Sequence, residues 1–145
     1  MAGEILVSAV RDMETQPSAF DLMIGTSEKI QELKSKLAQV APFDVSILLR
    51  GETGTGKELS ARIVHYLSDR STSPFIPVNC AAIPDQLFEN ELFGHKRGAY
   101  THAQTAQRGL IAAAENGTLL LDEVESLSER AQVKLLRFLE DRKYK

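Results

Sequence analysis

The chain has 145 residues, a net charge of −3 and a single cysteine, Cys80. This length suits one domain with a sizeable core, and an acidic chain without a dense Lys/Arg cluster is not expected to contact DNA itself. One cysteine excludes an internal disulfide, and no apolar run approaches the roughly 18 residues of a membrane span. Residues 1–20 lack a signal peptide and any regular period, so they predict a linker or upstream tail before a domain over 21–145. We expect a cytoplasmic protein that does not contact membranes.

The elements before residue 70 are two helices and one strand. The first helix is expected to begin at Thr26 or Ser27, both good N-caps, and to end at Pro42. The apolar run 45–50 predicts a buried strand, and a second helix is expected over about 57–68. The residues expected to turn inward on the two helices are Ile30, Leu33, Leu37, Val40, Leu59, Ile63, Val64 and Leu67.

A strand, a helix and a long loop follow in the chain. The strand is expected over 75–80, where Pro77 leaves the pairing incomplete on one side. A short helix is expected over 84–93 with Pro84 at its first position. Residues 94–107 predict a long loop or hairpin, which in a compact domain is usually functional or disordered.

The last third of the sequence completes an alternation of strands and helices. A short helix is expected over 110–115, a third strand over 118–121, and a last helix that begins at Ser126 or Ser128 and runs to the C-terminus. Its inward residues are expected to be Ala131, Leu135, Phe138 and Leu139. Such alternation predicts an α/β fold with a largely parallel sheet and helices on both faces. Ligands of such sheets bind beyond the C-terminal ends of the strands.

The segment 51–58, with the sequence GETGTGKE, predicts a phosphate-binding loop. Its glycines allow a tight turn and leave backbone N–H groups accessible to an anion, while the following helix adds its positive end and Lys57 a full charge. This is the G-x-x-x-x-G-K pattern. A glycine-rich hairpin is the alternative, which the strand–loop–helix context disfavours. Glu58 stands where Ser or Thr usually binds Mg²⁺; it could reach the metal through a water or stabilise the helix N-terminus.

A second motif places two carboxylates at the end of the strand over 118–121. Asp122 is positioned to hold Mg²⁺ through waters, and Glu123 to take a proton from an attacking water. Asn79, at the end of the preceding strand, could orient Glu123 or only cap a turn. The three histidines and Cys80 share no metal-ligand spacing, so we expect no zinc site.

With these motifs the chain resembles, over about residues 22–142, the first part of the central AAA+ ATPase domain of bacterial sigma-54-dependent transcription activators, the enhancer-binding proteins. Glu58 is what this family commonly carries after the lysine. The matching stretches are Ile24-Gly25, Gly51 to Leu59, Val78 to Ala82, Glu91 to His95, Gly98 to Ala103 and Gly117 to Glu123. The resemblance implies a P-loop NTPase core, a three-layer αβα arrangement that here lacks the family's helical lid.

The resemblance also implies roles for individual residues, with ATP and Mg²⁺ as cofactors. Ile24 and Gly25 would lie by the adenine, and Asn79 would act as a switch on Glu123. The ATP-binding residues would be Ile24, Gly25, Gly51, Glu52, Thr53, Gly54, Thr55, Gly56, Lys57, Glu58 and Asp122.

The stretch 98–103, Gly-Ala-Tyr-Thr-His-Ala, corresponds to the family's sigma-54-contacting G-A-F-T-G-A loop, which implies that Tyr100 and Thr101 contact sigma-54. His102 replaces a glycine that adopts positive φ at little cost, so we expect a loop of different shape. Residues 110–112 read Leu-Ile-Ala where the family usually has Arg-Phe-Glu, charges that in the family couple subunits and loop movement.

The leading hypothesis is an ATPase module of a sigma-54-dependent regulator that drives the sigma-54 RNA polymerase to the open complex, assembled as a homo-oligomeric ring. DNA would be bound only by a further domain. Trans-acting arginines and the lid would follow Lys145, so the 145-residue piece alone is expected to hydrolyse ATP weakly or not at all. One alternative is a nucleotide-sensing regulatory module that does not engage sigma-54 productively. Another AAA+ machine, such as an unfoldase or helicase loader, is disfavoured by the 98–103 stretch.

Overall fold

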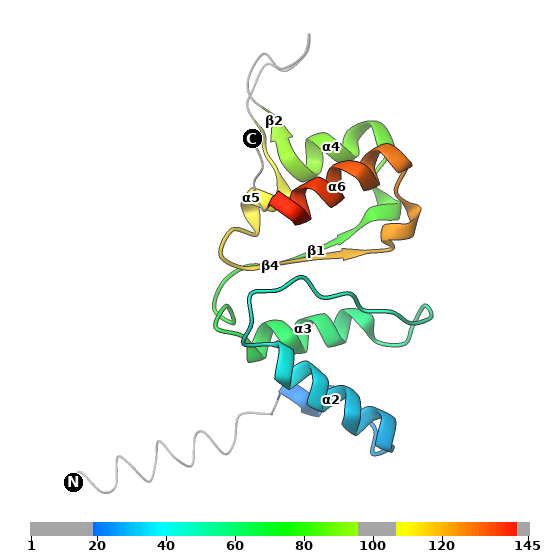
Figure 1. Ribbon diagram of the computed structural model, residues 1–145, viewed down its shortest axis with the longest axis vertical. Coiled ribbons are helices and arrows are strands. Elements are labelled where there is room, and N and C mark those ends of the chain that lie inside the picture. The colour runs from blue at the N-terminus through cyan, green and yellow to red at the C-terminus, as the bar shows by residue number, and fades with distance from the viewer. Residues whose placement is uncertain (1–18, 96–106, 142–145) are drawn as a thin grey trace, which may run out of the picture.

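The computed structural model describes residues 19–95 and 107–141 (Figure 1). Strands β1 (Phe75–Asn79) and β4 (Thr118–Asp122) pair in parallel, with Phe75 opposite Thr118 and Asn79 opposite Asp122. Helices α4 (Asp85–Phe93) and α6 (Glu129–Asp141) lie on one side of this strand pair, and α3 (Lys57–Leu67) and α2 (Glu28–Val40) lie on the other (Figure 1). The expected α/β arrangement with parallel strands between helical layers is therefore confirmed.

The first helical layer is built as the sequence predicts. Ser27 is the N-cap of α2, and its Oγ accepts the N–H of Ile30 at 3.4 Å. A short 3-10 helix, η1 (Ala19–Leu22), precedes α2. Apolar residues of η1, α2 and α3 pack into one core, whose buried members are Met23, Leu37, Ala41, Ile63 and Val64. This core fixes α3, and hence the glycine segment before it, against α2.

A second core lies under α4 and α6. Helix α5 (Leu110–Ala113) and the short 3-10 helices η2 (Cys80–Ala82) and η3 (Val124–Ser126) also border it. The buried members of this core are Cys80, Phe88, Leu92, Ile111, Leu127, Ala131 and Leu135. Two residues each of β2 (Gly94–His95) and β3 (Gln107–Arg108) pair antiparallel, which confirms the hairpin alternative at the base of 94–107.

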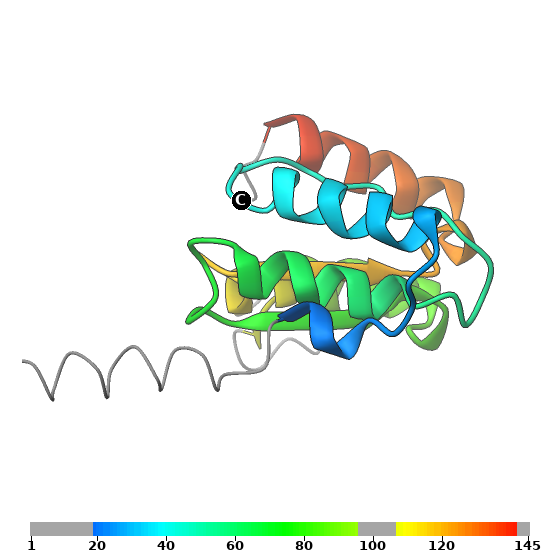
Figure 2. The ribbon, with the colours of Figure 1, turned by 90° about the horizontal axis from the view of Figure 1, so that it is seen from below.

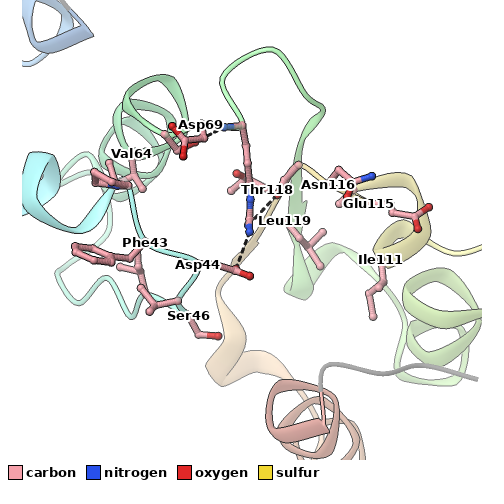
Figure 3. A pocket seen from close by; sticks show the side chains of 18 of the residues that line it. Phe43, Asp44, Ser46, Val64, Asp69, Ile111, Glu115, Asn116, Thr118 and Leu119 are labelled. Carbon is pink, nitrogen blue, oxygen red and sulfur yellow. Dashed lines mark hydrogen bonds and ion pairs between the residues drawn. The ribbon is translucent and has the colours of Figure 1, made fainter.

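The expected strand over residues 45–50 is wrong: the segment forms no strand, and Leu48 is 75% exposed. A parallel strand depends on a neighbour for its backbone hydrogen bonds, and no strand in the described ranges pairs with this segment. A cavity of about 700 Å³ instead separates residues 41–47 from the start of β4 (Figure 3). Asp44 and Arg70 form an ion pair of 2.7 Å beside it.

Smaller differences concern helix ends and faces. Leu67 and Leu139 are exposed rather than inward, and Ser60 and His65 are buried on α3 instead. Pro84 is the N-cap of α4 and not its first helical residue. Viewed from below (Figure 2), α3 runs alongside the strand pair. Within the described ranges, no helix has the length and apolar character needed to span a bilayer.

Candidate functional site

The glycine segment before α3 contains two glycines in the left-handed conformation, a backbone that also occurs in anion-binding concavities. Gly54 and Gly56 have φ of +82° and +87°, a conformation that residues with a Cβ adopt only at a cost. A Cβ built on either residue meets nothing within 4 Å, so open space faces this backbone. Gly56 is the N-cap of α3 and offers no side chain to cap the helix. Because the first N–H groups of a helix have no partner within it, this end is suited to an anion.

Lys57 places a positive charge inside this loop. Its Nζ donates hydrogen bonds to the carbonyl oxygens of Gly51 and Glu52, both at 3.0 Å. The Oγ1 of Thr55 donates to the same Glu52 oxygen at 2.7 Å. The ammonium is therefore folded back over the loop, where neutral carbonyl groups hold it. A phosphate would compete with these carbonyls for a charge-assisted bond, which is the stronger type.

The end of β4 brings the predicted acid pair next to Asn79. Asp122 and Asn79 are partners in the strand register, and Asp122 Oδ1 accepts the N–H of Glu123 at 3.0 Å. Glu123 has φ of +53°, a left-handed conformation that costs a residue other than glycine about 1–2 kcal/mol. Such strain is concentrated at functional sites. The adjacent Cys80 thiol has its pKa raised, first by burial and then by the nearby carboxylates, Asp122 foremost.

Asn79 caps a turn, which is one of the two roles that the sequence predicts for it. Its Oδ1 accepts the N–H of Ala81 at 2.9 Å, at the start of η2. The cap fixes the side chain at the strand end, beside the acid pair. Its role as a switch on Glu123 stays a prediction.

The glycine segment and the acid pair lie on the same side of the molecule. In Figures 1 and 2, the loop that leads into α3 and the arrow tips of β1 and β4 point the same way. The strands are parallel and end at Asn79 and Asp122, so the acid pair lies at their C-terminal edge. This is the edge where ligands of such sheets bind.

The other predicted site residues are less closely tied to this edge. Ile24 is 94% exposed, so its side chain has almost no protein neighbours. Gly25 has φ of +143°, and a Cβ there would lie 3.1 Å from Ile30 Cγ1. Tyr100 and Thr101, which the resemblance implies contact sigma-54, and also His102, lie outside the described residues.

The donor set fits a nucleotide with its own metal better than a protein-held ion. Within the described residues, no group of three or more His, Cys, Asp and Glu side chains could hold a metal. Mg²⁺ commonly binds through one or two carboxylates together with phosphate oxygens and waters. Asp122 at the strand end, with phosphates at the glycine segment, would supply such a set.

Two interactions around α3 were missed from the sequence. Arg62 donates to Glu58 Oε1 from Nε at 3.0 Å and from Nη2 at 2.7 Å; the i,i+4 spacing was the available signal. His65 is buried, and its Nδ1 lies 2.9 Å from Thr118 Oγ1. These two residues are 53 positions apart, and no local pattern predicts their contact.

Comparison with known proteins agrees with this geometry. The family model of the sigma-54 interaction domain matches residues 23–145. The Nif-specific regulatory protein of Herbaspirillum seropedicae is 50% identical over 124 residues, which are 86% of this chain and 23% of that protein. The regulatory protein AtoC of Escherichia coli (strain K12) is 48% identical over 122 residues, 84% of this chain and 26% of that protein. The chain therefore spans about a quarter of the length of these relatives.

A solved structure shares the fold. The crystal structure of NtrX from Brucella abortus in complex with ATP matches with a TM-score of 0.74 and 32% identity, covering 100% of this chain and 32% of that one. This likeness, together with the parallel strands and the glycine segment before α3, confirms the expected P-loop NTPase core. On the family match over residues 23–145, the chain belongs to the sigma-54 interaction domain family of bacterial transcriptional regulators.

Proposed function

We propose that this chain is the ATP-binding part of a sigma-54-dependent regulator whose ATPase drives the sigma-54 RNA polymerase to the open complex. The observation that carries the proposal is the pair of left-handed glycines, Gly54 and Gly56, followed by Lys57 at the N-terminus of α3. The related NtrX of Brucella abortus has been solved in complex with ATP and with ADP, which supports the same ligand here.

In this proposal, each predicted site residue has one role in binding or hydrolysing ATP. Segment 51–58 binds the phosphates through backbone N–H groups, and Lys57 exchanges its bonds to Gly51 and Glu52 for the outer phosphates. Asp122 would hold Mg²⁺, which offsets phosphate charge when bound. Glu123 accepts a proton from the attacking water. Ile24 and Gly25 lie by the adenine, where the exposed Ile24 side chain gains apolar contact.

In this proposal, ATP hydrolysis and the binding of partners also need groups other than the described residues. Hydrolysis needs a positive charge from a neighbouring subunit, typically an arginine worth several kcal/mol in the transition state. We propose that the 145-residue chain alone turns ATP over weakly or not at all, and that the complete regulator works as a homo-oligomeric ring in the cytoplasm. Tyr100 and Thr101 would contact sigma-54, and DNA would be bound by another domain.

Calorimetric titration of the chain with Mg-ATPγS tests nucleotide binding. The wild-type chain should bind in the micromolar range, and Lys57→Ala should weaken binding at least tenfold, because segment 51–58 then has no positively charged side chain for the phosphates. Lys36→Ala, an exposed lysine on α2, serves as the matched control and should bind as the wild type does. Absence of heat with the wild-type chain would contradict the proposal.

A second candidate function is a nucleotide sensor that does not remodel sigma-54. This function is favoured by α5, where Leu110-Ile111-Ala112 replaces the family's usual Arg-Phe-Glu, whose charges couple subunits and loop movement. The Ile111 side chain is buried. His102 gives the same indication from the sequence. In transcription assays with the full-length protein, ATP-dependent open complexes support the first function. Their absence in the wild type, with recovery in His102→Gly, supports the second.

A further inference from the structure

We propose that Arg62 is a positioning residue for the nucleotide site, which holds the Glu58 carboxylate on the outer face of α3 and pairs its charge. This inference rests on the proposed nucleotide binding. Glu58 directly follows Lys57 in the first turn of α3, so it is the acidic side chain nearest in sequence to the phosphate-binding lysine. Its Oε1 accepts two hydrogen bonds from Arg62, at 3.0 Å and 2.7 Å, one turn further along the helix.

The position of Glu58 makes its charge a problem for an anionic ligand. A carboxylate in the first turn of a helix is attracted to the same N–H groups and helix dipole that bind a phosphate. An unpaired carboxylate there would compete for the helix end and repel the triphosphate. Pairing with Arg62 turns the carboxylate along the helix toward residue 62 and offsets its charge.

Arg62 is itself held in place. Its guanidinium carbon lies 4.8 Å from the centroid of the Phe75 ring, at the start of β1. The buried His65 ring packs on the same Phe75 at a centroid distance of 5.3 Å, and His65 Nδ1 contacts Thr118 of β4. Because cation–π contact and the two hydrogen bonds orient one planar group, Arg62 links the first turn of α3 to the paired strands.

A purely structural role predicts a different pattern of effects. The Glu58–Arg62 pair is exposed, with side-chain exposures of 53% and 41%, and exposed pairs at i,i+4 add little to stability. Loss of such a pair should leave nucleotide affinity unchanged. If Arg62 acts by restraining Glu58, the effect of removing Arg62 must depend on whether residue 58 carries a charge.

The test is a double-variant cycle with Mg-ATPγS binding measured by calorimetry on the 145-residue chain. Arg62→Ala should weaken binding about fivefold to tenfold relative to the wild type. The double variant Arg62→Ala/Glu58→Gln should bind at least fivefold more tightly than Arg62→Ala. Salt at about 0.5 M should shrink the Arg62→Ala defect, because screening acts on exposed charges. Arg62→Lys should fall between wild type and Arg62→Ala, since it keeps the charge and loses the fork.

The controls separate this inference from folding and from nucleotide binding itself. Lys36→Ala breaks the exposed Glu32–Lys36 pair of 2.6 Å, which has the same i,i+4 spacing on α2, and should leave affinity unchanged. Far-UV circular dichroism of each variant checks folding; if Arg62→Ala is unfolded, Arg62→Lys carries the comparison with and without Glu58→Gln. Binding by Arg62→Ala equal to wild type, or a defect of the same size in the double variant, overturns the inference. A wild-type chain that gives no heat refutes the proposed function instead.

Discussion

Gly117 lies between α5 and β4, where the backbone of Pro74, the residue before β1, approaches it closely. A Cβ built on Gly117 would overlap the carbonyl oxygen of Pro74 and would lie 3.0 Å from the Pro74 carbonyl carbon. The same Pro74 oxygen accepts the N–H of Thr118 at 2.9 Å, just before the first paired residues of β1 and β4. Gly117→Ala must therefore push the two strands apart where their pairing begins.

The magnitude follows from three terms. Inserting a methyl group into packed structure costs about 1–3 kcal/mol, and losing one backbone hydrogen bond costs about 1 kcal/mol. Alanine restricts the unfolded chain and returns about 0.4–1 kcal/mol. We expect a net loss of about 2–3 kcal/mol in the free energy of unfolding, which for a domain of this size lowers Tm by about 5–12 °C.

Urea denaturation of the chain, followed by circular dichroism, measures this loss. Gly54→Ala is the matched control: its Cβ meets nothing within 4 Å, but its φ of +82° strains alanine, so it should cost only about 1–2 kcal/mol. Gly117→Ala within about 0.5 kcal/mol of wild type would refute the steric reasoning. So would a loss no greater than that of Gly54→Ala.

Three further changes test the cores and the buried or paired charges. Phe88→Ala, at a side chain with 0% exposure, should cost about 3–5 kcal/mol in urea denaturation. Burial lowers the pKa of His65 from 6.5, so as the pH falls the imidazole is protonated in the unfolded chain before it is protonated in the folded one. The free energy of unfolding should therefore decrease as the pH drops below about 6.5. His65→Asn should reduce the change in the urea midpoint between pH 7.5 and 5.5. The hydrogen bond from Lys134 lowers the pKa of Glu89 from 4.5, so the ionised carboxylate stabilises the fold above that pH. This stabilisation should be lost in more acid solution, as Glu89 is protonated in the folded chain. Glu89→Gln should therefore reduce the dependence of Tm on pH below 4.5. Profiles that match wild type would contradict the two pH expectations.

Local signals predicted most of the elements. The Ser27 cap and the Pro42 stop correctly bracket α2. The glycine-to-lysine pattern correctly predicted that α3 begins at Lys57. Gly56 is the N-cap of α3 in a left-handed conformation, and the helix starts at the next residue. The apolar run before Asp122 correctly predicted β4 and the acid pair at its end, and here the paired strand β1 supplies the partner that a parallel strand needs.

Contacts between distant segments could not be predicted in this way. The bond between His65 and Thr118 depends on how α3 packs on β4. Leu139 has the spacing of an inward residue, yet it is exposed and lines the cavity beside β4. Periodicity defines which residues share a face; the neighbouring elements determine how much of that face is covered.

Residues 45–50 make the same point with direct consequence for the site. Their apolar, β-branched sequence is suited to a strand, but pairing is a property of two segments, and the cavity of about 700 Å³ separates this one from β4. The glycine segment is held mainly where Gly56 enters α3, because the core around Ile63 and Val64 fixes that helix, while Leu49 before the segment packs only partly buried on the same core. For this reason the proposal of a nucleotide site rests on the glycine φ angles, Lys57 and the acid pair, and not on the preceding apolar run.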